Sequence, residues 1–252
     1  MVTASHPLKL EKLVVEQTAE VLEFLAKRPL HTVFMAGIIR DNGLISPLNR
    51  GSFYACRNET GAIEGVALIG HAVLVEAHTE VALTSFALLA QSFPRAHMIM
   101  GEQEKIEHFW HHYSAAGQAP RLVTREFLYE QTWPVMVGDP VPGLRPATLE
   151  HLPHVMSVNA RMAFEESGIN PLETDPVGFR LRCARRIEQG RVWVWCEDGR
   201  LIFKSDIVAD TRNVIYLEGI YVNPEDRGKG YGLRCLSQLS RNLLARTSSV
   251  AV

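Results

Sequence analysis

The chain has 252 residues, of which 46% are hydrophobic and 21% charged, and its formal net charge is −2 at pH 7. The length suits two domains of ordinary size, and the composition is that of a globular protein. No tract of Lys and Arg indicates a nucleic-acid surface, and no apolar run reaches the ~20 residues that a membrane span needs, so we expect neither nucleic acid nor membrane as a partner.

The cysteines and the N-terminus bear on the compartment. Cys56, Cys183, Cys196 and Cys235 are widely scattered and form no C-x-x-C pair. This usage is typical of reduced thiols rather than of a disulfide framework or a zinc site. Residues 1–7 lack the basic start and the apolar core of a signal peptide. We therefore expect a cytoplasmic protein.

The first half of the chain alternates between helix and strand patterns. Periodicity and turn residues predict helices over 13–26, 79–91 and 102–113, and strands over 51–57, 62–76, 97–100 and 122–130. The first helix is expected to end at Arg28-Pro29, because the residue before a proline disfavours the helical conformation. This order favours an α/β layered fold.

A linker is predicted over residues 132–143. Three prolines and two glycines fall between Gln131 and Gly143, and together they exclude a continuous helix or central strand. The boundary divides the chain into a first domain, 1–131, and a second domain, 144–252.

The second half predicts the order β, α, α, β, β, β, α, β. The expected elements are a strand at 144–148, helices at 149–166 and 175–189, strands at 192–197, 200–208 and 214–222, a helix from about 233 to 246, and an apolar run from 249. Asp198-Gly199 is a hairpin turn signal between the first two strands of that group.

The segment after strand 214–222 carries the most specific signal. The strand ends at Asn223-Pro224, and Arg227, Gly228, Lys229, Gly230 and Gly232 follow before the helix. Glycines let the backbone approach a ligand closely, and the helix N-terminus adds N–H donors and a partial positive charge. Arg227 and Lys229 add full charges. The pattern predicts a cradle for a diphosphate.

Three phosphate-loop templates compete for this segment. The P-loop pattern fails because Gly230, rather than a hydroxyl residue, follows Gly228-Lys229, and the dinucleotide pattern G-x-G-x-x-G fails on spacing. The pattern [QR]-x-x-G-x-[GA] fits at Arg227, Gly230 and Gly232. The segment therefore resembles the coenzyme A pyrophosphate loop of the GNAT acyltransferases, and a Gly-rich surface turn is the alternative.

The resemblance extends over nearly the whole chain. Leu144 to Thr148 resembles the first strand of GNAT enzymes. Phe164 to Pro171, Glu197 to Asp206 and Gly219 to Val222 are similar to a bacterial group in which a GNAT domain follows a divergent GNAT-like N-terminal domain, and the first half, from about Leu10 to Gln131, resembles that companion. It implies two GNAT-like domains of α/β (α+β layered) class. The first half has no [QR]-x-x-G-x-[GA] loop, so we expect no coenzyme A there.

The resemblance also implies an activity, the transfer of an acetyl group from acetyl-CoA, as acyl-donor cosubstrate, to a primary amine of a small molecule or peptide. The implied cofactor-binding residues are Ile220, Tyr221, Val222, Arg227, Gly228, Lys229, Gly230, Tyr231 and Gly232. Glu218 is the candidate catalytic base, and strand alternation places it on the face of Ile220 and Val222. An ion-paired structural Glu218 is the alternative.

Glu165 and Glu166 flank the loop between the first two helices of the second half, which borders the acceptor site in the superfamily. They are the candidate substrate-binding residues, and a solvated helix end is the alternative.

One departure from the family pattern bears on the function. A complete GNAT domain continues after its fifth strand with a helix and further strands, and this sequence stops at Val252. We expect strand 214–222 to lack full cover on one side. Three explanations of this departure are kept: the chain is truncated, a homo-oligomer completes the open sheet, or catalysis is impaired. The last favours a catalytically weak acyl-CoA-binding or interaction protein.

Other chemistry-bearing residues fit structural roles. His108, His111 and His112 share a helix face, but no H-E-x-x-H motif accompanies them, so no metal site is predicted. Cys235 is expected to be a core thiol, and Trp193 and Trp195 are expected to pack in the core or a cleft.

Overall fold

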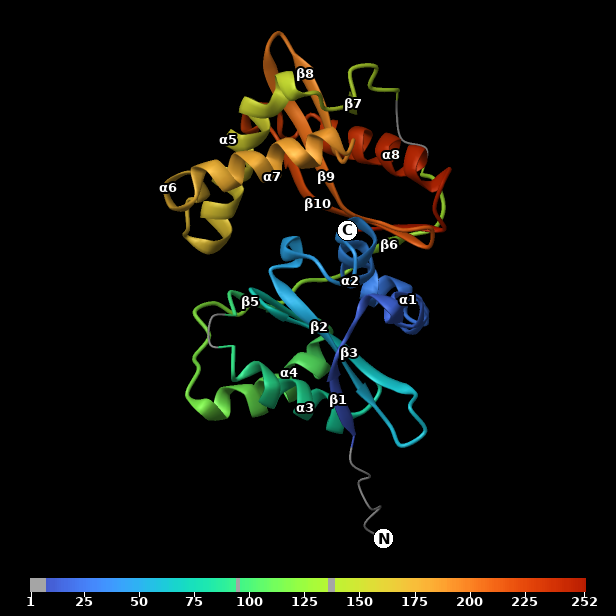
Figure 1. The fold of residues 1–252 in the computed structure, drawn as a ribbon. Coiled ribbons are helices and arrows are strands. Elements are labelled where there is room, and N and C mark those ends of the chain that lie inside the picture. Colours follow the sequence, from blue (N-terminus) through green and yellow to red (C-terminus); the bar gives the residue numbers. More distant parts are fainter. Residues whose placement is uncertain (1–7, 94–95, 136–138) are drawn as a thin grey trace. The chain divides into compact units, whose positions relative to one another are not determined.

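A computed structural model of the protein describes residues 8–93, 96–135 and 139–252. The chain divides into two compact units, Met1–Glu126 (the first unit) and Phe127–Val252 (the second unit). Each unit is a β-sheet with helices on both faces (Figure 1). The structure thus confirms the prediction of two α/β layered domains.

The sheet of the first unit has the strand order β1-β2-β3-β4-β5. Its strands are β1 (Lys9–Lys12), β2 (Gly51–Arg57), β3 (Ile63–Gly70), β4 (Ala72–Ala77) and β5 (Met98–Met100). Its helices are α1 (Thr18–Ala26), α2 (Pro29–Asn42), α3 (Glu80–Ala90) and α4 (Gln103–Tyr113), with 3-10 turns at Val15–Gln17, Pro47–Asn49 and Ser114–Ala116. Helices α1 and α2 pack on one face and α3 and α4 on the other.

The sheet of the second unit has the order β6-β11-β10-β9-β8-β7. Its strands are β6 (Glu130–Gln131), β7 (Arg145–Pro146), β8 (Val192–Glu197), β9 (Arg200–Asp210), β10 (Val214–Val222) and β11 (Ser249–Ala251). Its helices are α5 (Leu152–Ser167), α6 (Pro171–Thr174), α7 (Pro176–Glu188) and α8 (Tyr231–Leu244), with 3-10 turns at Leu149–His151 and Pro224–Asp226. Helices α5 and α7 cover one face of the sheet, and α8 covers the other (Figure 1).

The two sheets share one plan. In each, a run of antiparallel strands is followed by a helix that returns the chain to a parallel neighbour: β4, α3, β5 in the first unit and β10, α8, β11 in the second. The strand patterns 51–57, 192–197 and 214–222 are observed with the predicted bounds. Asp198 and Gly199 both have positive φ, 50° and 73°, as a tight hairpin turn requires.

Two elements of the first unit differ from expectation. Helix α1 ends at Ala26, ahead of Arg28-Pro29 as expected, but Pro29 then begins α2, a helix that was not predicted. A proline at the first helical position lacks only an N–H that would have no partner there. Strand β1, too short to show a clear alternation, pairs with β2.

The predicted strand 122–130 is wrong. Its residues are all exposed, so their alternation buries no face of a sheet. Only Glu130–Gln131 form a strand, and they pair antiparallel with β11 of the second unit. Tyr129 and Val252 extend that pairing with backbone hydrogen bonds of 2.7 and 3.0 Å. The units divide at Glu126 and Phe127, ahead of the predicted linker 132–143, of which residues 136–138 lie outside the described residues.

The outer edge of the second sheet is covered in part by this chain itself. Strand β11 pairs with β10 from Val214 to Tyr216, and β6 pairs with β11 in turn. The expected open edge is therefore limited to the second half of β10. Within the described residues, no strand pairs with Leu217 to Val222 on the β11 side.

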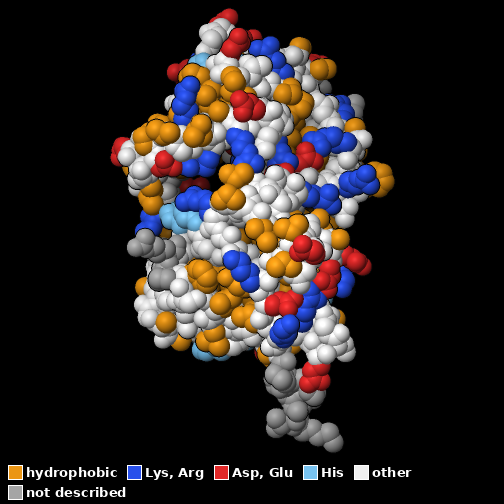
Figure 2. All heavy atoms as spheres, in the orientation of Figure 1, with side chains coloured by type: hydrophobic (Ala, Val, Ile, Leu, Met, Phe, Trp, Pro, Cys, Tyr) orange, Lys and Arg blue, Asp and Glu red, His pale blue; other side chains and the backbone are white. Residues whose placement is uncertain are grey.

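The surface charges and the helix lengths bear on the expectations drawn from the composition. Acidic and basic side chains lie among one another over the face drawn in Figure 2. None of the helices in the described part of the chain is long and apolar enough to cross a membrane.

Candidate functional site

Strand β10 contains a β-bulge at Gly219. Glu218 lies opposite Asp206 and Tyr221 lies opposite Lys204, so two residues of β10, Gly219 and Ile220, face the single residue Ser205 of β9. Gly219 adopts a left-handed φ of 59°, which glycine accommodates without the steric cost that other residues incur.

The bulge changes which side chains share a face. Ile220 and Val222 pack with Leu217 on the α8 side of the sheet, whereas Tyr221 packs on the α5/α7 side. Glu218, opposite Asp206, lies on the same side as Tyr221. The prediction that Glu218 shares a face with Ile220 and Val222 is wrong, because the extra residue breaks the period of two.

Within the described residues, the edge of β10 beyond Tyr216 has no strand partner on the β11 side. Strand β11 leaves β10 after three residue pairs, while β9 continues to pair with β10 as far as Val222. Backbone N–H and C=O groups of a strand edge pair readily with an extended partner. The segment from Leu217 to Val222 can therefore hold an extended chain carrying amide groups.

The loop after β10 leads directly to the N-terminus of α8. The Asn223 side chain donates to the carbonyl of Leu201 and accepts from the N–H of Glu225, which fixes the turn. Gly228 and Gly230 have φ of 78° and 76°, and a Cβ added at either would meet no atom within 4 Å. The outer side of the loop is thus open.

Helix α8 begins without a side-chain cap. Its N-cap is Gly230, and the first backbone hydrogen bond to that residue comes from Arg234. The N–H groups of the first turn therefore lack intrahelical partners. Together with the helix dipole, these donors favour an anion at the loop.

A buried carboxylate braces the same loop. Asp226 is 2% exposed, accepts from Lys229 Nζ at 2.7 Å, and lies 3.1 Å from the Arg200 guanidinium. The Lys229 hydrogen bond, with Arg200 nearby, lowers the pKa of Asp226, and the same bond raises the pKa of Lys229. Arg227 is exposed, and its Nε donates to the carbonyl of Val222. Both predicted cations thus lie at the loop.

The first turn of α8 packs closely on its surroundings. A Cβ at Gly232 would lie 3.1 Å from Val222 Cγ2, so glycine allows close approach of the helix to β10. The Tyr231 ring meets Trp195 edge-on, with centroids 4.9 Å apart. Trp195 thus packs beside the loop, consistent with its predicted packing role.

The structure adds two buried charges that the sequence interpretation missed. Lys204 is fully buried and donates to Asp206 Oδ2 at 2.9 Å and to the carbonyl of Gly219 at 3.0 Å. The signal was the pattern Lys-x-Asp between the apolar runs 201–203 and 207–209 of β9, which places both side chains on one face.

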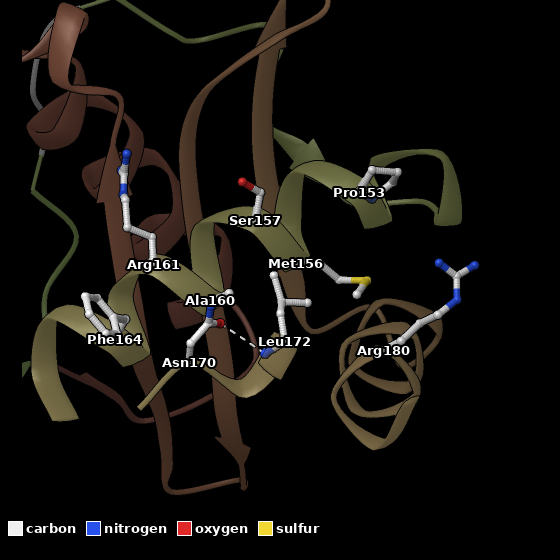
Figure 3. Close-up of a pocket in the computed structure, with 9 residues that line it drawn as sticks. All are labelled: Pro153, Met156, Ser157, Ala160, Arg161, Phe164, Asn170, Leu172 and Arg180. Atoms are coloured by element: carbon white, nitrogen blue, oxygen red, sulfur yellow. Dashed lines mark hydrogen bonds between the residues drawn. The ribbon is translucent and has the colours of Figure 1, made fainter. Parts of the chain in front are cut away.

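A pocket of about 500 Å³ lies among α5, α6 and α7 (Figure 3). It is lined by Pro153, Met156, Ser157, Ala160, Arg161, Phe164, Asn170, Leu172 and Arg180. The Arg161 guanidinium also lies over the Tyr221 ring, 4.9 Å from its centroid. The pocket thus adjoins β10 on the face that carries Glu218.

The predicted acidic residues occupy different surroundings. Glu218 is exposed on β10. Glu165 and Glu166 are exposed near the end of α5, and Glu165 lies 3.7 Å from Arg161, a residue of the pocket. Asp175, which flanks the same loop, caps α7 by accepting from the N–H of Gly178.

The remaining candidates have structural surroundings. His108 Nε2 lies 3.0 Å from Thr84 Oγ1, and across the described ranges no cluster of three or more His, Cys, Asp or Glu could hold a metal ion. Burial raises the pKa of the Cys235 thiol to about 12, consistent with a core residue.

Comparisons with known proteins agree with this geometry. Residues 159–248, from α5 through the loop and α8, match the model of the acetyltransferase (GNAT) family. No curated protein sequence matches the chain.

Solved structures resemble the whole chain at low sequence identity. A Drosophila protein shares 12% identity with a TM-score of 0.58, and a tandem GNAT protein from the clavulanic acid biosynthesis pathway shares 14% with a TM-score of 0.50. A GNAT-family acetyltransferase from Colwellia psychrerythraea shares 10% with a TM-score of 0.50. Each similarity covers 97% of this chain and 89% of the other. Residues 159–248 of the second unit are therefore similar to the GNAT family, and the chain has the fold of the tandem GNAT protein.

Proposed function

We propose that the protein is an N-acetyltransferase that transfers the acetyl group of acetyl-CoA to a primary amine of a small molecule or peptide. One observation carries the proposal: the edge of β10 from Leu217 to Val222, which no strand covers within the described residues, continues into the open glycine loop at the uncapped start of α8. An extended amide chain ending in a diphosphate, as in coenzyme A, matches both parts.

The diphosphate is assigned to the loop. Backbone N–H groups between Gly228 and Gly232 would donate to its oxygens, and Arg227 and Lys229 would add positive charge. The positive φ of Gly228 and Gly230 and the open side of the loop support this assignment. The pantetheine would pair with backbone groups of Ile220, Tyr221 and Val222 in the manner of an added strand.

The reaction needs a neutral amine and a polarised thioester carbonyl. The amine nitrogen attacks the carbonyl carbon, the C–S bond breaks, and the thiolate of coenzyme A leaves and takes a proton from solvent. A backbone N–H at the bulge would stabilise the oxyanion of the tetrahedral intermediate. Glu218 would accept the proton of the amine, directly or through a water.

The acceptor is assigned to the α5/α7 side of β10. Glu218 and the pocket among α5, α6 and α7 both belong to that side, and Arg161 connects the pocket to Tyr221. Glu165 and Glu166 are the proposed acceptor-binding residues at the end of α5. An exposed Glu218 on the same face of the sheet suits an amine that arrives from solvent.

The first unit supplies a contrast within the same chain. Its corresponding helix, α3, follows β4 without a glycine loop, and its N-cap Thr79 accepts from the N–H of Ala82 at 3.3 Å. A donor of that first turn is therefore already used. This difference supports acetyl-CoA binding by the second unit alone, with residues up to 131 as the divergent companion domain.

Two measurements on the whole protein test the proposal. Isothermal titration calorimetry with acetyl-CoA measures binding, and release of free thiol in the presence of a panel of primary amines measures transfer. Binding with amine-dependent thiol release supports the enzyme. Binding without thiol release for any amine would instead support the alternative, a catalytically weak acyl-CoA-binding protein. Absence of binding would refute both.

A further inference from the structure

The Gly219 bulge rests on a buried cation. Lys204 has no exposed surface, and its Nζ donates both to the Gly219 carbonyl at 3.0 Å and to Asp206 Oδ2 at 2.9 Å. A Cβ at Gly219 would lie 2.8 Å from Lys204 Nζ and 3.1 Å from Asp206 Oδ2. The ammonium group, the carboxylate and the bulge are therefore in direct contact.

This arrangement is costly for the fold. Taking two charges out of water carries a large desolvation penalty, and a buried ion pair often stabilises a protein no more than apolar side chains would. Asp206 is 5% exposed, and its Oδ1 has no hydrogen-bond partner among the described residues. The pair is thus incompletely satisfied, and a role in stability alone does not account for it.

Lys204 determines the direction of one peptide group. The peptide between Gly219 and Ile220 is planar and trans, so its C=O and N–H point in opposite directions. Because Lys204 holds the Gly219 carbonyl, the Ile220 N–H points away from the Lys204 ammonium group. Beyond Tyr216, the opposite edge of β10 has no strand partner among the described residues.

The charge on Lys204 also affects the strength of that N–H as a donor. A hydrogen bond from an ammonium group to a carbonyl is stronger than one from a neutral donor, and hydrogen bonds in a chain polarise one another. The peptide between them thus becomes a better donor at its nitrogen. Asp206 Oδ2 lies 2.9 Å from Lys204 Nζ and so compensates the charge of the ammonium group in this buried site.

We propose that Lys204, held by Asp206, is a positioning residue that orients and polarises the Gly219–Ile220 peptide so that the Ile220 N–H stabilises the oxyanion formed from the thioester. This inference rests on the proposed acetyl-CoA site. Lys204 is fully buried, so it acts through the peptide and does not touch the substrate.

The test compares the wild-type protein with two variants. Lys204→Met alone leaves Asp206 buried and unpaired, so the informative variant is Lys204→Met with Asp206→Leu, in which apolar side chains replace the pair. Ser205→Ala is the matched control. Ser205 lies between the two residues in the sequence of β9, it is buried, and its hydroxyl has no partner among the described residues. Thermal melting of each variant checks that it folds.

The main readout needs no acceptor. The carbonyl stretch of acetyl-CoA labelled with ¹³C at the acetyl carbonyl, bound to the protein, falls in frequency when a donor polarises that carbonyl. We expect the wild type and Ser205→Ala to lower the frequency equally. The double variant should bind acetyl-CoA with a Kd within about threefold of wild type, because the loop assigned to the diphosphate is unchanged. It should return the frequency toward its solution value, because Lys204 no longer orients and polarises the Ile220 N–H.

Transfer kinetics supply a second readout. With an amine that the wild type acetylates, kcat of the double variant should fall by ~10–100-fold while the KM for acetyl-CoA changes little, since part of one oxyanion interaction is lost. Equal carbonyl frequencies in wild type and double variant would overturn the role of Lys204 and leave the acetyl-CoA site intact. Failure of the wild type to bind acetyl-CoA would overturn both.

Discussion

Comparing Gly230→Val with Gly190→Val distinguishes an effect on ligand binding at the loop from the general effect of backbone strain on stability. Gly230 has φ of 76° and Gly190, after α7, has φ of 69°, and a Cβ at either position meets no atom within 4 Å. Val at either position should therefore destabilise the protein by a similar amount, ~1–2 kcal/mol for a left-handed β-branched residue. Gly190→Val is thus a matched control for the fold.

The two variants should differ in acetyl-CoA binding. At position 230 the Val side chain would project into the side of the loop where the diphosphate is assigned, and it would block approach to the backbone donors. Loss of about two hydrogen bonds to a charged group, each worth ~1.5–3 kcal/mol, costs ~3–6 kcal/mol. The Kd should rise by ~10²–10⁴-fold.

Calorimetry and thermal melting measure both effects. We expect similar melting temperatures for the two variants and weakened binding only for Gly230→Val. If the two variants bind acetyl-CoA with the same Kd, the diphosphate does not lie at this loop, and the assignment of the second unit as the cofactor-binding domain loses its main support.

Three further outcomes follow from the structure. Glu218→Gln removes the proposed base while keeping the shape of the side chain. The kcat/KM near neutral pH should therefore fall by ~10²–10⁴-fold with unchanged acetyl-CoA affinity. Wild-type rates of the variant from pH 6 to 9 would contradict the assignment of Glu218 as the base. The hydrogen bond from Arg57 lowers the pKa of Glu11 from 4.5 to about 2, so this stabilisation is complete above the unfolded pKa and is lost as pH falls toward about 2. Glu11→Gln should therefore flatten the fall of melting temperature between pH 5 and 2, and parallel melting curves for the two proteins would show that the pair does not contribute. Leu239 of α8 is fully buried, so Leu239→Ala should lower the free energy of unfolding by ~2–5 kcal/mol in a denaturant titration, whereas a loss below ~1 kcal/mol would argue against this packing.

Local sequence determined the elements that surround the candidate site. The apolar run 214–222, the glycines at 228 and 230, and the amphipathic stretch after them specify strand, loop and helix within about thirty residues. These signals are local because a strand needs a period of two, a left-handed φ needs glycine, and a helix needs an apolar stripe. The same holds for Asp198-Gly199, whose turn conformation depends on those two residues alone.

Tertiary structure decided the features that sequence reasoning missed. The bulge at Gly219 depends on how β10 pairs with β9, and that pairing reverses the face expected for Glu218 and places Lys204 beneath the bulge. The partner of β11 comes from Glu130–Gln131, more than one hundred residues upstream, where the sequence alternates without showing which sheet it joins. Strand register and strand partners are set by contacts between distant segments, and a single strand's own pattern does not carry them.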